Sequence, residues 1–175
     1  MSDHYLKLLP KITTMIFDVD GVLTDGMVTL LPTGEQLRSL NSKDGFAIQL
    51  AVKKGLRICV ITGGNSENVK SRLSKMGVSD IYLRILHKIE TYEDIKVMYD
   101  LTDEEIMFMG DDLPDYEIMS KVGVPACPNN AAREIKDIST YISDQDGGKG
   151  CVRDIIEKVL RSQNKWVKNP SDLSW

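Results

Sequence analysis

Two aspartates stand one residue apart at the end of a strongly apolar run. Residues 15–17 are Met, Ile and Phe, and they lead directly into Asp18, which Asp20 and then Gly21 follow. Such a run predicts a buried parallel strand that delivers carboxylates to its C-terminal edge, where open α/β sheets bind their ligands. Two carboxylates in this spacing can share one cation and still act as separate chemical groups. The alternative is an Asx-type turn that only caps the strand.

A hydroxyl and two glycines end a second apolar run. Residues 57–62 finish in Thr62, and Gly63 and Gly64 separate it from a predicted helix. The hydroxyl, the backbone N–H groups and the positive end of a helix dipole together favour an anion such as phosphate. Any β–α turn can use the same residues, so this segment alone leaves both interpretations open.

Three acids follow the apolar run of residues 106–110. They are Asp111, Asp112 and Asp115. A lysine, Lys88, follows another predicted strand. Asp112 fits as the N-cap of the helix that follows, which accounts for one acid but not for all three. Taken alone, Lys88 fits a solvated surface position, which is where most lysines are found.

Adjacent strands would bring Asp18, Asp20, Asp111 and Asp115 into one crevice. Several carboxylates at close range cannot all stay ionised without compensation. A divalent cation with oxygen ligands provides it, and Mg²⁺ prefers a few carboxylates together with waters and a substrate phosphate. The predicted anion-binding turn and the lysine supply the positive pole, so the pattern indicates phosphoryl transfer.

The elements that must position these groups alternate between apolar strands and amphipathic helices, which predicts an α/β fold with a parallel sheet. The predicted strands cover residues 14–18, 57–62, 80–83, 106–110, 124–126 and 141–143. The predicted helices cover residues 44–54, 66–76, 89–99, 114–122, 131–137 and 151–162.

Three segments depart from this alternation. Residues 27–40 predict a β-hairpin with a four-residue turn at 32–35, and such a hairpin can shield a site or pair with another subunit. The Gly-rich residues 145–150 predict a flexible loop. The polar residues 163–175 are expected to be partially ordered at best.

Length, net charge and cysteine content limit the classes of protein to which this chain can belong. A chain of 175 residues predicts one domain with a small insertion, and a net charge of −4 gives no reason to expect nucleic acid or an anionic membrane. The three cysteines show no CxxC spacing, which argues against a disulfide framework or a zinc site. The N-terminus lacks the pattern of a signal peptide and no stretch suits a membrane span, so a cytoplasmic setting is expected.

In their order along the chain, the motifs resemble those of the haloacid dehalogenase (HAD) superfamily of phosphohydrolases. The four motifs are Asp18-x-Asp20-Gly-Val-Leu-Thr-Asp-Gly, Thr62, Lys88, and Gly-Asp111-Asp-x-x-Asp115. The resemblance covers about residues 11–162, and segments 41–45, 61–64 and 147–154 are similar to a capless subgroup. It implies a single domain over residues 1–175: a Rossmann-like parallel sheet with helices on both faces, a hairpin insertion and no cap domain.

The resemblance also implies roles for the acids. Asp18 would be the nucleophile and form an aspartyl-phosphate. Asp20 would contact the substrate, protonate the leaving oxygen and then accept a proton from the hydrolytic water. Asp18, Asp111 and the backbone carbonyl of Asp20 would bind Mg²⁺, with Asp115 beside them as a direct or indirect ligand.

Contacts with the substrate follow from the same resemblance. Thr62, Gly63 and Lys88 correspond to groups that hold phosphoryl oxygens. Ser42 corresponds to a loop position that contacts the substrate, and Arg72 to an arginine that grips the carboxylate of a sugar acid. An ordinary surface position on its helix is the equal alternative for Arg72.

The subgroup dephosphorylates 3-deoxy-D-manno-octulosonate 8-phosphate, an eight-carbon sugar acid of lipopolysaccharide synthesis, and this is the expected substrate. The subgroup also implies a homotetramer in which the hairpins of four subunits pack together. One alternative is a phosphatase for nine-carbon keto-deoxy sugar acid 9-phosphates, and another is a noncatalytic HAD-fold partner of a nucleotidyltransferase.

Three positions depart from the pattern of the subgroup. Gly64 stands where some relatives carry Arg or Glu, and Lys75 matches a lysine of the nine-carbon branch. Arg84 stands where relatives usually have a glycine. Because an arginine lacks the backbone freedom of glycine, the loop before Lys88 is expected to differ.

Overall fold

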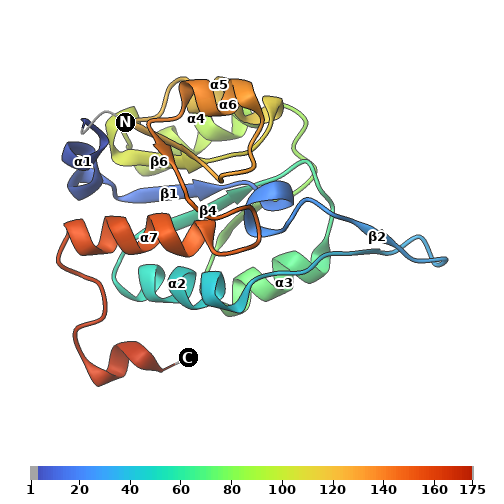
Figure 1. Cartoon of the computed structure of the whole chain (residues 1–175), viewed down its shortest axis with the longest axis horizontal. Helices are drawn as coiled ribbons and strands as arrows, with labels where there is room; N and C mark the ends of the chain where they lie inside the picture. The colour runs from blue at the N-terminus through green and yellow to red at the C-terminus, as the bar shows by residue number, and fades with distance from the viewer. Residues whose placement is uncertain (1–3, 175) are drawn as a thin grey trace.

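The computed structural model describes residues 4–174, and a six-stranded parallel sheet organises them (Figure 1). The strand order is β5-β4-β1-β6-β7-β8. The bounds are β1 Thr14–Phe17, β4 Arg57–Ile61, β5 Asp80–Tyr82, β6 Ile106–Met109, β7 Val124–Cys127 and β8 Tyr141–Ile142. The predicted parallel α/β sheet is therefore confirmed.

The central strands are buried on both faces, which explains their continuous apolar sequences. Along β1, Met15 and Phe17 belong to one hydrophobic core, whereas Ile16 belongs to the other. Every residue of β1 and of β6 is buried. Two hydrophobic cores, one on each face, therefore enclose the central strands.

Helices cover both faces of the sheet (Figure 1). One face carries α2 Ser42–Lys53, α3 Glu67–Lys75 and α7 Cys151–Ser162. The opposite face carries α4 Lys88–Tyr99, α5 Tyr116–Met119 and α6 Arg133–Ile138. A short additional helix, α1 His4–Leu8, precedes β1 and lies outside the predicted elements.

The helix predicted over residues 114–122 is shorter than expected. Its first part is a 3-10 turn, Leu113–Asp115, and only Tyr116–Met119 is α-helical. The side chain of Asp112 accepts a hydrogen bond from the N–H of Leu113 at 2.8 Å. Asp112 is therefore an N-cap, as predicted, but it caps the 3-10 turn and not a long helix.

A β-hairpin extends away from the body of the molecule (Figure 1). Its strands, β2 Thr29–Leu30 and β3 Gln36–Leu37, are antiparallel. The N–H of Leu31 donates to the carbonyl of Glu35 at 2.9 Å, so the turn has three residues and not the predicted four. Gly34, at φ +82°, takes the left-handed position that three-residue turns require. No cap domain is present among the described residues.

The Gly-rich loop of residues 145–150 is packed, and the expectation of a flexible loop is wrong. The N–H of Gly148 donates to the carbonyl of Val22 at 2.9 Å, and that of Gly147 donates to Asn130 at 2.9 Å. A Cβ on Gly147 would collide with the carbonyl of Gly21. The glycines thus allow two backbones to approach closely, which is a different use of glycine from flexibility.

The C-terminal segment is also more ordered than expected within its described part. Trp166 packs against the core, and Pro170–Leu173 forms a short 3-10 helix. Asp172 accepts a hydrogen bond from Lys54 at 2.7 Å, which fixes this helix to the end of α2. Among the described residues, no helix has both the length and the apolar character that crossing a bilayer would require.

Candidate active site

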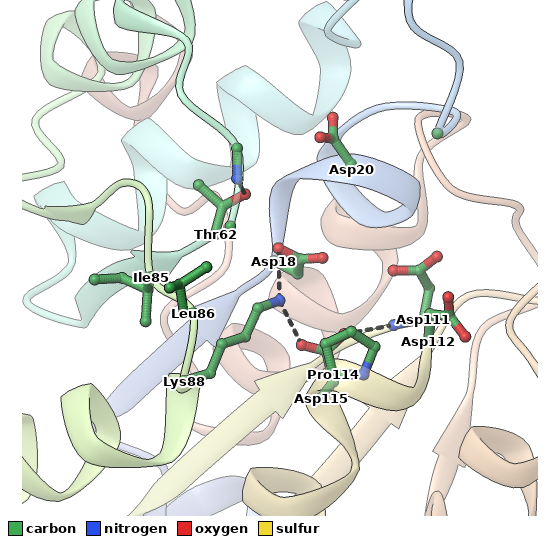
Figure 2. Close-up of a pocket in the computed structure, with 13 residues that line it drawn as sticks. Asp18, Asp20, Thr62, Ile85, Leu86, Lys88, Asp111, Asp112, Pro114 and Asp115 are labelled. Atoms are coloured by element: carbon green, nitrogen blue, oxygen red, sulfur yellow. Dashed lines mark hydrogen bonds and ion pairs between the residues drawn. The ribbon is translucent and has the colours of Figure 1, made fainter.

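A cavity of about 490 Å³ lies where the central strands end (Figure 2). Its walls come from the loops after β1, β4 and β6 and from the segment that leads into α4. Most of the residues singled out from the sequence line it together, namely Asp18, Asp20, Thr62, Gly63, Lys88, Asp111 and Asp115. The parallel strands bring these groups together, because all their carboxyl ends meet at one edge.

A compact turn after β1 presents Asp18 to this cavity. Gly21 has φ +91°, and a Cβ there would collide with the carboxylate of Asp111. Thr24 closes the turn, since its N–H donates to the carbonyl of Val19 at 3.0 Å and its hydroxyl accepts from the N–H of Gly26 at 3.2 Å. Glycine at position 21 is therefore required both by the backbone and by the neighbouring acid.

Lys88 links two of the acids. Its Nζ lies 2.9 Å from Oδ1 of Asp18 and 2.7 Å from Oδ1 of Asp115. The second oxygen of Asp115 accepts a hydrogen bond from the N–H of Asp111 at 3.1 Å (Figure 2). The side chain of Lys88 is only 6% exposed, so the alternative of a solvated surface lysine is excluded.

Burial and mutual repulsion raise the pKa values of the acids. The pKa of Asp18 rises to about 6, first because the group is buried and then because of the charge of Asp115. The pKa of Asp111 rises to about 7, again through burial, followed by the charges of Asp18 and Asp115. Burial opposes the charge of Lys88, but the two acids outweigh it and raise the pKa of the ammonium.

These residues fit a divalent cation. Asp18, Asp111 and Asp115 each offer a carboxylate oxygen, and the three oxygens lie within 4.8 Å of one another. Hard oxygen ligands of this kind are those that Mg²⁺ selects. The raised pKa values show that one ammonium does not compensate the cluster, and a dication would supply the missing charge.

Thr62 stands beside this cluster at the end of β4. It is 3% exposed, and its hydroxyl accepts a hydrogen bond from the N–H of Gly64 at 3.0 Å. The neighbouring loop is fixed by two bonds, from the N–H of Arg84 to the carbonyl of Gly64 and from the N–H of Ile85 to that of Thr62. The turn therefore has a defined shape around the exposed Gly63.

Arg84 adopts a left-handed backbone with φ +59°. An arginine thus holds a backbone conformation that glycine adopts more readily, and the expected difference between this loop and that of the subgroup stays a prediction. This conformation costs a residue with a Cβ roughly 1–2 kcal/mol, and the hydrogen bonds on either side hold it in place.

Arg38, which directly follows β3 of the hairpin, was not among the residues predicted from the sequence. Its guanidinium donates two hydrogen bonds to Asp20, from Nε to Oδ1 at 2.6 Å and from Nη2 to Oδ2 at 3.0 Å. Nothing in the local sequence distinguishes Arg38 from any polar residue of a hairpin strand. Only the fold brings the hairpin beside the turn after β1.

Two predicted substrate contacts lie outside the cavity. Ser42 is exposed at the first position of α2. Arg72 is exposed on α3 and lines a separate cavity of about 290 Å³, which it shares with Arg38. Within one subunit, the described structure thus does not bring Ser42 or Arg72 together with Asp18.

Comparison with known proteins agrees with this geometry. Residues 66–155 match the model of a family described as haloacid dehalogenase-like hydrolase. The chain is also 30% identical over 165 residues to the 3-deoxy-D-manno-octulosonate 8-phosphate phosphatase KdsC of Salmonella typhi, covering 94% of this chain and 88% of that protein. The chain belongs to the haloacid dehalogenase-like hydrolase family.

Two crystal structures show how far the likeness extends. The phosphatase for 3-deoxy-D-manno-octulosonate 8-phosphate from Yersinia pestis matches with a TM-score of 0.91 at 27% identity, over 94% of this chain and 89% of that chain. The corresponding enzyme from Moraxella catarrhalis, in complex with a magnesium ion, a phosphate ion and KDO, matches with a TM-score of 0.90 at 26% identity, over 94% of each chain.

Proposed function

We propose that this protein is a Mg²⁺-dependent phosphatase that hydrolyses 3-deoxy-D-manno-octulosonate 8-phosphate. The observation that carries the proposal is the buried Asp18, which stands next to Lys88 and to two further carboxylates in one cavity. The name of the Salmonella typhi relative and the ligands of the Moraxella catarrhalis structure support this substrate.

The reaction takes place in two steps. A carboxylate oxygen of Asp18 attacks phosphorus, the bond from phosphorus to the sugar oxygen breaks, and that oxygen takes a proton from Asp20. The product on the protein is an aspartyl-phosphate. A water then attacks this phosphorus, Asp20 takes its proton back from the water, and inorganic phosphate leaves Asp18 unchanged.

The remaining groups hold the phosphoryl oxygens. Lys88, the hydroxyl of Thr62 and the N–H of Gly63 form the positive side of the cavity. When bound by Asp18, Asp111 and the backbone carbonyl of Asp20, Mg²⁺ supplies the charge that offsets the phosphoryl group. Both oxygens of Asp115 are engaged with the protein, so its part is to hold Lys88 and the backbone of Asp111 in place.

The carboxylate of the sugar acid requires a cation, and among the described residues that line the cavity only Lys88 carries a positive side chain. We assign this contact to Arg72 together with Ser42, supplied by a neighbouring copy in a homotetramer. The exposed positions of both residues are compatible with a contact between subunits. The hairpin also carries exposed apolar side chains, with Met27 72% and Leu30 73% exposed, which suits a subunit interface. The expected location is the cytoplasm.

Parallel turnover assays test this assignment. The octulosonate 8-phosphate and a nine-carbon keto-deoxy sugar acid 9-phosphate are offered to the protein with Mg²⁺ and again with EDTA. We expect Mg²⁺-dependent phosphate release with a higher kcat/KM for the eight-carbon ester. Equal rates would contradict the substrate assignment, and no turnover of any phosphate ester would favour a noncatalytic partner of a nucleotidyltransferase.

A further inference from the structure

A bidentate ion pair joins the hairpin to the candidate active site. It connects the guanidinium of Arg38 to both carboxylate oxygens of Asp20, at 2.6 and 3.0 Å. The side chain of Arg38 is 6% exposed and that of Asp20 is 33% exposed. Exposed ion pairs contribute little to stability, but two parallel hydrogen bonds from a covered guanidinium define the orientation of a carboxylate.

Neighbouring loops hold the pair from two sides. A Cβ on Gly64 would lie 3.4 Å from Oδ2 of Asp20 and 3.7 Å from Nη2 of Arg38, so the pair packs against the backbone of the phosphate-binding turn. On the other side, the hydroxyl of Thr24 lies 3.5 Å from Oδ1 of Asp20. Gln36 also accepts a hydrogen bond from Nη2 of Arg38 at 3.2 Å.

The carboxylate of Asp20 is thereby kept apart from Lys88 and from the acids that pair with it. Figure 2 shows it pointing away from the cluster formed by Asp18, Lys88 and Asp115. In an in-line displacement, the leaving oxygen departs opposite the attacking carboxylate, so a proton donor acts there and not beside the lysine. Without its partner, the Asp20 side chain would be free to change rotamer.

We propose that Arg38 is a positioning residue for Asp20, which it holds on the leaving-group side of the cavity. In this role Arg38 acts through Asp20, and it is not among the residues that line the cavity. The proposal rests on the proposed function, in which Asp20 gives its proton to the leaving oxygen; the ion pair described here is the ionised form of Asp20, which takes the proton back from the hydrolytic water. It also gives the hairpin a role within its own subunit, in addition to any contact with a neighbouring copy.

Leaving groups that differ in their need for a proton test this role. Wild type, Arg38→Met and Arg38→Lys are compared in single turnovers of the octulosonate 8-phosphate and of p-nitrophenyl phosphate, whose phenolate departs without protonation. We expect Arg38→Met to slow release of the sugar acid about 100-fold. Release of p-nitrophenolate should keep its rate, and Arg38→Lys should recover part of the loss because an ammonium can still pair with Asp20.

A matched change on the same hairpin serves as the control. Glu35 accepts a hydrogen bond from Asn68 at 3.1 Å, and Glu35→Ala removes this link to α3 without touching the ion pair. We expect wild-type rates with both esters. The role of Arg38 would be overturned if Arg38→Met slowed both esters equally or slowed neither. It would also be overturned if Glu35→Ala slowed turnover as much as Arg38→Met does. Lack of turnover by the wild type would instead contradict the proposed function.

Discussion

A carboxylate that attacks phosphorus must be ionised, and the burial of Asp18 works against this. Lys88, at 2.9 Å, favours the ionised form, but burial and the charge of Asp115 still raise the pKa of Asp18 to about 6. The same causes raise the pKa of Asp111 to about 7. Positive charge from a bound dication would reverse these shifts, so metal binding and nucleophile activation are coupled.

Replacing the nucleophile separates chemistry from folding. Asp18→Asn keeps the shape of the side chain but removes its attacking oxygen and its charge. We expect turnover to fall at least about 1,000-fold, while the fold and substrate binding persist. Phosphate release and calorimetric binding measure the two effects. Asp137→Asn, at an exposed position on α6, is the control, and wild-type turnover in Asp18→Asn would refute the assigned nucleophile.

The raised pKa values predict how metal affinity depends on pH. Asp111 takes up a proton as the pH falls below about 7, and Asp18 does so below about 6. Mg²⁺ must displace these protons before it binds. We therefore expect the affinity to fall with decreasing pH, by about tenfold per pH unit for each proton released. Titration calorimetry at pH 8.0 and 5.5, in buffers of different ionisation enthalpy, measures both the affinity and the protons. A Kd that is the same at both pH values would contradict this coupling.

At the scale of elements, the loops determine the local shape of the site more than the strands and helices do. The turn after β1 lies under the Gly-rich loop of residues 145–150, and Gly148 donates a hydrogen bond to the carbonyl of Val22. This loop leads into α7, so the last helix of the domain supports the first motif of the chain. The packing explains why glycines are required far from the catalytic acids in sequence.

Gly147→Ala tests this support. The added Cβ would collide with the carbonyl of Gly21, and the backbone must move to make room. We expect a loss of stability of about 1–3 kcal/mol together with reduced turnover, because the displaced turn carries Asp18. Chemical denaturation and phosphate release measure the two effects. Gln145→Ala, an exposed change in the same loop, should behave as wild type, and equal stability of both variants would contradict the close packing.

At the scale of the whole molecule, no cap domain covers the cavity among the described residues. The hairpin is the element best placed to cover the cavity, and it has contacts of two kinds. Arg38 pairs with Asp20 of its own subunit, whereas Leu30 and Leu37 are 73% and 44% exposed. Assembly through these apolar side chains would both bury them and bring exposed residues such as Arg72 toward a neighbouring site.

Charge on the apolar side of the hairpin should dissociate the assembly. We expect wild type to form a tetramer and the double change Met27→Glu with Leu30→Glu to form smaller species, because buried charges oppose association. Light scattering after size exclusion measures the masses. Val97→Glu, at an 84% exposed position on α4, is the matched control. An unchanged mass in the hairpin variant would show that the hairpin is not the contact.

Most of the site could be predicted because strand ends converge in a parallel sheet. Asp18, Thr62 and Asp111 each follow a recognisable apolar run, so their meeting at one edge follows from topology. The burial of Lys88 was harder to predict, because its local sequence resembles that of any exposed helix start. Arg38 could not be found, since its partner Asp20 lies 18 residues away and only the approach of the hairpin joins them.

By itself, the amino-acid sequence determined the parallel sheet, the order of its motifs and the chemical character of the groups at the strand ends. These depend on local periodicity and on residue type, which act over a few neighbouring positions. Only the tertiary structure decided which charges are paired, which glycines are packed and which arginine meets Asp20. Those outcomes depend on contacts between segments far apart in the chain, and only the packing of the elements brings such segments together.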